Sequence, residues 1–190
     1  MNRLHRVKAN HRLRAVTETS GQALVELAMG IGMLCVFALG IIDVSRAIYY
    51  RQVLESLAGQ GATMAARTAK SADTANKVIA NAGSDLAMST AGCVIVTAVT
   101  NTNTAQHPLQ VTDQAKSCGI SASSQIGCMY GVGGCATSNA TIPASAASVL
   151  QLNQAIYVTE IYYNYGTVTP LPKFITNLAM PSQLYAVGYQ

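Results

Sequence analysis

Five cysteines and three histidines are the residues of this 190-residue chain that could carry redox or metal chemistry. Four of the cysteines lie in the second half of the chain, at Cys93, Cys118, Cys128 and Cys135. Thiols on the oxidising side of a membrane form disulfides, and four of them allow two bridges in three connectivities. The spacing alone does not choose among the three. Each bridge would stabilise a small domain by about 2–4 kcal/mol, because it restricts the unfolded chain.

Zinc binding is the alternative use of these cysteines. Zinc sites commonly contain two cysteines separated by two residues, and no such pair occurs here. The gaps after Cys118 and Cys128 are nine and six residues, and His107 is the only histidine nearby. We therefore expect no metal and no cofactor. The fifth cysteine, Cys35, lies in an apolar segment, where we expect an ordinary buried thiol.

Catalytic residues are not evident in the sequence. Two of the three histidines, His5 and His11, lie in a basic N-terminal segment, which leaves little material for acid–base chemistry. We find no nucleophile, base and orienting group close together along the chain, although such groups meet in space rather than in sequence. We expect that the protein is not an enzyme.

The charges of the chain gather at its N-terminus. Residues 1–21 hold five basic residues and one acidic residue, and so account for the whole net charge of +4. Residues 22–190 hold seven of each sign. A basic arm can bind the phosphates of nucleic acid. The neutral remainder and the apolar segment that follows the arm favour a membrane role instead, so we expect no nucleic-acid partner.

An apolar segment of membrane length follows the basic arm. Residues 27–42 contain no charge and no proline, and extending the segment back to Gln22 adds one charge, Glu26. At ~1.5 Å per residue, these 21 residues span ~31 Å, close to the ~30 Å hydrocarbon core of a bilayer. Basic residues mark the cytoplasmic side of such a helix. We therefore expect residues 22–43 to cross the lipid bilayer, with the N-terminus in the cytoplasm and the C-terminal part outside it.

Three ordinary interpretations compete for this segment. A buried helix of a soluble protein would show a polar face, which residues 27–42 lack. An ordinary signal peptide would be cut after a small residue such as Gly40, leaving an exported or anchored extracytoplasmic binding domain. A simple uncleaved anchor leaves Glu26 unexplained, because a carboxylate costs ~2.5–3.5 kcal/mol at the bilayer centre and less near an edge. A charged residue in such a place is by default a functional one.

The residues around this glutamate resemble a known family. The sequence GQALVE at residues 21–26 resembles the leader junction of type IV prepilins, which a membrane aspartyl peptidase cuts after the glycine. A glycine suits that site because a missing Cβ lets the peptidase approach the backbone closely. With LGIIDVSR at residues 39–46 and YRQ at residues 50–52, the segment resembles the TadE family. These proteins are the minor pilins, or pseudopilins, of tight-adherence secretion systems.

The resemblance implies a processing step and a set of partners. Residues 1–21 would be a leader that a prepilin peptidase removes between Gly21 and Gln22. The new amino group of Gln22 would pair with Glu26 of a neighbouring subunit and set the register of the packed helices. The other implied partners are further pilins and an inner-membrane assembly platform. The implied role is in pilus assembly and adherence, from the bacterial inner membrane with a periplasmic C-terminal domain, or within the pilus at the cell surface.

The rest of the chain predicts an α+β fold. Small and apolar residues recur at helical spacing after the membrane segment, so residues 44–90 are expected to be helical outside the membrane. A break near Ser71 would precede a second helix, capped by Asp73 and ending near Met88. Gly59 and Gly61 indicate a bend or a close helix contact.

Three segments rich in β-branched and aromatic residues predict a small antiparallel sheet within residues 91–190. These segments are residues 93–100, 155–165 and 183–189. Between the first two lies a stretch rich in Ser, Thr, Asn, Ala and Gly, residues 101–154, which we interpret as a loop insertion stapled by the disulfides. The tyrosines of the last two strands are expected to pack the sheet and its rim, and an exposed adhesive surface is the alternative.

Overall fold

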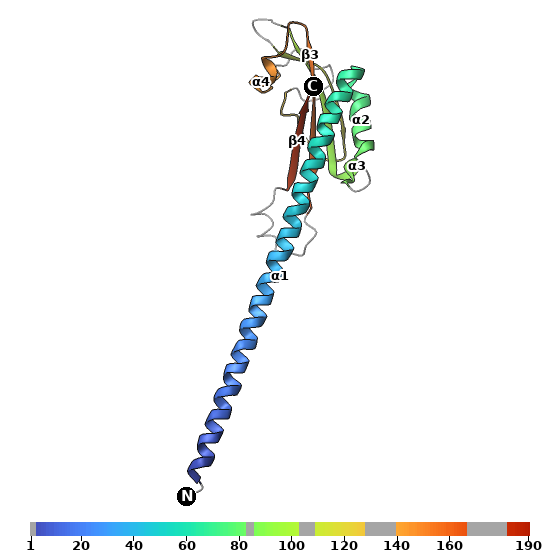
Figure 1. Ribbon diagram of the computed structural model, residues 1–190. Coiled ribbons are helices and arrows are strands. Elements are labelled where there is room, and N and C mark those ends of the chain that lie inside the picture. Colours follow the sequence, from blue (N-terminus) through green and yellow to red (C-terminus); the bar gives the residue numbers. More distant parts are fainter. Residues whose placement is uncertain (1–2, 83–85, 103–108, 128–139, 167–181) are drawn as a thin grey trace.

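The computed structural model describes residues 3–82, 86–102, 109–127, 140–166 and 182–190, with side chains from residue 21 onward. One helix, α1 (Arg3–Thr68), runs as a rod from the N-terminus into a small α+β unit at its far end (Figure 1). The other helices are α2 (Ser71–Asn81), α3 (Met88–Ala91) and α4 (Ala144–Ala147). The strands are β1 (Gly92–Asn101), β2 (Leu109–Cys118), β3 (Ala155–Asn164) and β4 (Gln183–Tyr189). The predicted fold class is confirmed.

The four strands form one antiparallel sheet in the order β2-β1-β3-β4. Ile95 on β1 pairs with Lys116 on β2 and with Glu160 on β3, which sets the register across the three strands. Successive side chains of a strand point to opposite faces. Val94 and Val96 accordingly join the core under the helices, whereas Ile95 contributes to the opposite face.

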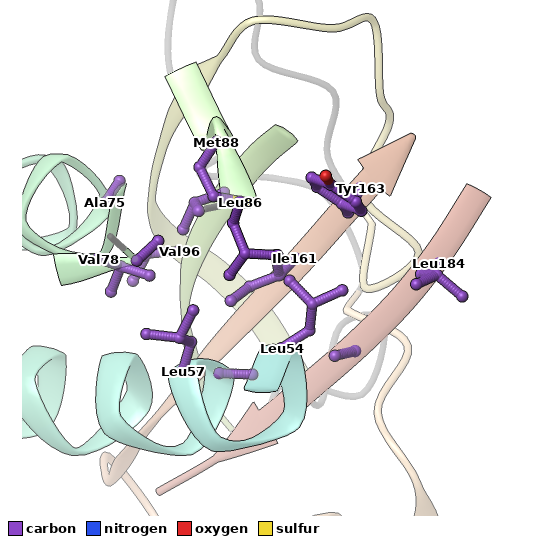
Figure 2. Packing of buried hydrophobic residues seen from close by; sticks show 14 of the residues in the cluster. Leu54, Leu57, Ala75, Val78, Leu86, Met88, Val96, Ile161, Tyr163 and Leu184 are labelled. Atoms are coloured by element: carbon purple, nitrogen blue, oxygen red, sulfur yellow. The ribbon is translucent and has the colours of Figure 1, made fainter. Parts of the chain in front are cut away.

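The second half of α1 packs on β3 and β4, and α2 packs on β1 and β2. Figure 2 shows Leu54 and Leu57 of α1 beside Ile161 and Val96 of the sheet. The predicted helical spacing of small and apolar residues is therefore confirmed where these residues are buried. They pack on the sheet of the same chain.

Two glycines allow α1 and the sheet to approach closely. A Cβ on Gly188 of β4 would lie 2.4 Å from the backbone carbon and oxygen of Ala58. A Cβ on Gly61 would lie 2.8 Å from a side-chain carbon of Thr159. The predicted close contact is confirmed at Gly61, but a Cβ on Gly59 would meet nothing within 4 Å.

The break between α1 and α2 lies near the predicted place. Ala69 adopts a left-handed conformation with φ of 50°, and its N–H donates to the Ala65 carbonyl at 2.8 Å. Lys70 is extended and precedes α2, so the prediction that Asp73 caps this helix is wrong. Asp73 lies in the first turn, where a carboxylate still interacts favourably with the helix dipole.

The second helix is also shorter than predicted, because α2 ends at Asn81 and Met88 begins the separate short helix α3. The residue before α3, Ala87, has a left-handed φ of 42°, which is incompatible with a continuous helix.

The interpretation of residues 101–154 as a loop is wrong at residues 109–118 and 144–147. The segment contains strand β2 and helix α4. Its described remainder covers the face of the sheet opposite α1, where Ile126 and Leu150 pack against Val99 and Val158. β2 escapes recognition because it is an edge strand whose sequence, LQVTDQAKSC, is mostly polar.

A disulfide joins Cys93 to Cys118, which face each other in the β1–β2 pairing. It therefore links two strands rather than closing a loop within residues 119–154. Cys128 and Cys135 lie outside the described residues. The strand predictions are confirmed to within one residue at each end, with β1 and β3 ending at Asn101 and Asn164 and β4 matching throughout.

Candidate functional site

The first described part of α1 carries its apolar side chains on the outside. We call residues 21–42 the shaft, and the described residues from Asp43 onward the head. Eleven large apolar side chains of the shaft are between 47% and 72% exposed. Complete burial of such a side chain is worth about 1.5–3 kcal/mol, so the shaft favours an apolar environment that the described residues do not provide.

The helix from Gly21 to Thr68 is long and apolar enough to cross a membrane, and none of its most apolar stretch is buried within the protein. It is the only such helix among the described residues. One N-terminal apolar helix of this kind is consistent with a single-pass membrane protein. The prediction that Cys35 is a buried thiol is wrong for the isolated chain, because Cys35 is a free, exposed cysteine on the shaft. Figure 1 shows that most of the shaft extends away from the described part of the head.

Gly21, Gln22 and Glu26 lie together at the start of the shaft. The Gln22 side-chain amide donates to a Glu26 carboxylate oxygen at 3.2 Å, one helical turn away, and both side chains are exposed. A neutral amide satisfies part of the hydrogen-bonding capacity of a carboxylate but does not neutralise its charge. In lipid, a cationic partner from outside the shaft would therefore stabilise the ionised form of Glu26.

At the other end of the shaft, a cluster of tyrosines ties the helix to the head. The Tyr165 hydroxyl donates to the backbone carbonyl of Asp43 at 3.0 Å. The ring of Tyr50 meets the rings of Tyr163 and Tyr165 edge-on, at centroid distances of 5.9 and 5.8 Å. The Arg46 guanidinium donates to the Tyr50 hydroxyl at 3.0 Å. Burial is the main cause that raises the pKa of Tyr163 and Tyr165.

Residues 21–63 match the family model of TadE-like proteins. The match begins at the glycine that precedes Gln22 and covers the shaft, the tyrosine-bearing turn at Tyr50 and most of the helix that packs on the sheet. The resemblance found in the sequence is thus confirmed over this TadE-like segment. The match associates the chain with tight-adherence pilus systems, and this pilus-associated family is not a family of enzymes. Comparison of the chain with curated proteins and with solved structures found no match.

Outside the TadE-like segment, a buried carboxylate organises the opposite face of the sheet. Glu160 on β3 is fully buried and accepts hydrogen bonds from four groups. The donors are the Ser124 hydroxyl, the Gln125 backbone N–H at 2.8 Å, the Tyr162 hydroxyl at 3.2 Å and the Tyr185 hydroxyl at 3.1 Å. Two donors come from the chain that covers the sheet, so Glu160 holds that chain in place.

Sequence reasoning missed this carboxylate cluster. The available signal is a single glutamate within the apolar and aromatic strand AIYVTEIYYN, since a buried carboxylate needs partners. Burial first, and the Glu160 charge second, raise the pKa of Tyr162 and of Tyr185 well above its usual value. Both hydroxyls therefore stay protonated and able to donate. Among the described residues, no three His, Cys, Asp or Glu side chains are placed to hold a metal ion.

Proposed function

We propose that this protein is a minor pilin, or pseudopilin, of a tight-adherence pilus or secretion system and takes part in pilus assembly and adherence. The observation that carries the proposal is the exposed apolar shaft, which begins at Gly21 and bears a single carboxylate, Glu26, one turn from Gln22. The match of residues 21–63 to the TadE-like family supports the same role.

In this proposal the chain has four parts. Residues 1–21 are a leader that a prepilin peptidase removes, and residues 22–43 cross the inner membrane with the N-terminus in the cytoplasm. Residues 44–90 form a periplasmic helical region, and residues 91–190 form the β-rich periplasmic domain. The shaft meets other pilins and the assembly platform, either in the membrane or in the pilus at the cell surface.

Cleavage after Gly21 supplies a cationic partner for Glu26. Hydrolysis of the Gly21–Gln22 peptide bond leaves a carboxylate on the leader and an α-amino group on Gln22. An amino group of a neighbouring subunit, placed against Glu26, neutralises a charge that would otherwise be costly in lipid. This pairing fixes how far one shaft lies along the next.

The mature N-terminus tests the processing step. The protein purified from a host that carries its secretion system should begin at Gln22, as measured by intact mass and N-terminal sequencing. A chain that begins near Ile41 would indicate ordinary signal-peptide cleavage and an exported binding domain. An uncut chain would indicate a simple anchor. Either result contradicts the proposal.

The variant Glu26→Ala tests the pairing. It should be cleaved as the wild type is, but it should assemble poorly, as measured by the amount of the protein in sheared pili or in cross-linked assembly complexes. Glu55→Ala is the matched control, because Glu55 is an exposed carboxylate of the same helix that pairs with Arg51 of its own chain at 2.9 Å. Normal assembly of Glu26→Ala would contradict the proposed register role.

A further inference from the structure

We propose that the head rests on the membrane surface through a collar at the end of the shaft, and that the collar binds the phosphate groups of anionic phospholipids. The collar consists of four residues of α1, Val44, Arg46, Ile48 and Tyr49. The inference rests on the proposed function to the extent that residues 22–43 must lie in the bilayer.

The collar lies at the level of the lipid headgroups. If the hydrocarbon ends near Ile42, a rise of ~1.5 Å per residue puts the backbone of Arg46 ~6 Å beyond it. The headgroup layer is roughly 5–7 Å thick on each side of the ~30 Å core. Side chains of a helix lean toward its N-terminus, which here is the direction of the bilayer. Arg46 therefore reaches the depth of the phosphates. The backbone of Tyr49 lies ~10 Å beyond Ile42, and its ring leans back toward the outer edge of the headgroup layer.

The exposed surface of the collar suits this boundary. Val44, Ile48 and Tyr49 are 44%, 53% and 60% exposed, so the apolar surface of the shaft continues past Asp43 and into the head. Tyrosine is favoured where an apolar layer meets water, because its ring is apolar and its hydroxyl is polar. A lipid surface satisfies both kinds of group at once.

Among the described residues of α1 just beyond the shaft, Arg46 carries the positive charge. Asp43, whose carboxylate attracts the guanidinium, is fully buried. The next charged residues along the helix, Arg51 and Glu55, already pair with each other at 2.9 Å. The collar thus carries one cationic side chain at the same level of the helix as three exposed apolar or aromatic ones, a combination that is complementary to an anionic lipid surface.

Contacts with Tyr50 fix the orientation of the Arg46 guanidinium. It donates to the Tyr50 hydroxyl at 3.0 Å, and its guanidinium carbon lies 5.7 Å from the centre of the Tyr50 ring. Tyr50 is fixed in turn by the rings of Tyr163 and Tyr165. A guanidinium has five N–H donors in a planar fork that matches phosphate oxygens, and the bond to Tyr50 occupies one of them.

Tryptophan fluorescence measures the depth of the collar. The chain has no tryptophan, so a single introduced one reports its own position. The full chain carrying Tyr49→Trp would be reconstituted in vesicles of phosphatidylcholine with increasing phosphatidylglycerol. Its emission should be quenched by lipids with a nitroxide on the headgroup more strongly than by lipids brominated deep in the acyl chain. Phe37→Trp, an exposed position within the shaft, should show the opposite preference.

The role of Arg46 is measured in the Tyr49→Trp background. Adding Arg46→Gln should raise the phosphatidylglycerol fraction that gives half-maximal headgroup quenching about fivefold, the factor expected for one basic residue at an anionic surface. Arg51→Gln is the matched control and should leave that fraction unchanged, because Arg51 is paired with Glu55 farther from the bilayer.

The outcomes distinguish failure of the collar proposal from failure of the proposed function. Emission from Tyr49→Trp that is water-like and unquenched, beside Phe37→Trp quenched by deep bromine, would overturn the collar and leave the membrane helix intact. Loss of deep quenching in Phe37→Trp would instead overturn the membrane placement. Phosphate binding would be overturned if the headgroup quenching of Tyr49→Trp did not depend on the phosphatidylglycerol fraction. It would also be overturned if Arg46→Gln and Arg51→Gln had equal effects on that quenching.

Discussion

The two halves of α1 present opposite surfaces, although they belong to one continuous helix. In the shaft the apolar side chains are large and exposed, and Met29 reaches 72% exposure. In the half that packs on the sheet, many buried positions are small, and Ala58, Ala62 and Ala65 are completely buried. The first half leaves its apolar surface outside the fold, and the second half uses a narrow face to approach a sheet.

This difference in side-chain size between the two halves indicates which surface each half can pack against, a fluid lipid phase or a rigid sheet. Lipid chains adapt to any shape, so large branched residues are suitable in the shaft. A β-sheet is rigid, and the approach of α1 to β4 depends on Ala58 and on the missing side chain of Gly188. Packing therefore determines the stability of the head, whereas main-chain hydrogen bonds would determine that of the shaft in the membrane placement proposed for it. Damage to the head should leave the shaft helical.

The largest effect is expected from Gly188→Ala. The added Cβ would lie 2.4 Å from backbone atoms of Ala58, so two main chains must move apart. We expect a loss of about 4 kcal/mol in the free energy of unfolding of the head, above the usual range for overpacked positions because the neighbours are backbone. Thermal unfolding in detergent would measure the loss, and the circular dichroism that remains after the transition should still show the helical shaft.

Gly59→Ala is the matched control on the other side of this contact. Its Cβ would meet nothing within 4 Å, so the substitution should stabilise the helix by about 0.5–1 kcal/mol. Equal losses in Gly188→Ala and Gly59→Ala would mean that close approach is not what joins α1 to the sheet.

The next effect is expected from removing the disulfide with Cys93→Ala and Cys118→Ala together. The bridge spans 25 residues, and its loss should destabilise the head by about 3 kcal/mol while the shaft stays helical. Counting thiols in the denatured, unreduced wild type checks the bonding. One thiol indicates a second bridge besides that between the strands, three indicate that only the strand bridge exists, and five would contradict the structure.

The shaft and three of the four strands are predictable from the sequence because their signals are local. An apolar run of membrane length needs no partner to be recognised, and the strands that contain Val96, Ile161 and Val187 are rich in β-branched and aromatic residues. Strand β2 is polar and lies at an edge, so its main determinant is pairing with β1, which no local pattern reveals. The ends of α2 depend on left-handed residues such as Ala87, which propensity does not anticipate.

The functional residues also fall into those that are close together in the sequence and those that only the fold brings together. Gly21, Gln22 and Glu26 are neighbours on one helix, so their spacing alone brings them together. The tyrosine cluster at the end of the shaft and the Glu160 cluster join residues that are far apart in the chain, as in the bond from Tyr165 to Asp43. Four spaced cysteines likewise left the connectivity open until the pairing of β1 with β2 placed Cys93 opposite Cys118.

A smaller effect is expected from alkaline pH, which acts on the head and not on the shaft. Burial raises the pKa of Tyr162 and Tyr185, so the folded head holds these protons more tightly than the unfolded chain, in which a tyrosine has a pKa of about 10. This stabilisation is complete below about pH 10 and is lost as the pH rises above it. The unfolding temperature of the head should therefore fall steeply above that pH.

Tyr185→Phe removes one of these two groups and one hydrogen bond to Glu160. The variant should be less stable at neutral pH, but its loss between pH 10 and pH 12 should be smaller than that of the wild type by about 2 kcal/mol. Tyr49→Phe, at an exposed position outside the Glu160 cluster, controls for the loss of a tyrosine. The same pH dependence in Tyr185→Phe and in the wild type would exclude Tyr185 as the cause.

The smallest effect is expected where the two regions meet. Tyr165→Phe keeps the ring against Tyr50 and removes the hydrogen bond to the Asp43 carbonyl, so the head should lose about 1 kcal/mol. Hydrogen exchange should quicken at the backbone amides near Asp43 and stay unchanged in the middle of the shaft. Tyr163→Phe is the matched control, because it removes a hydroxyl from the same cluster without affecting that bond. If both variants quicken exchange equally, the general packing of the tyrosines, and not the bond from Tyr165, holds the head to the shaft.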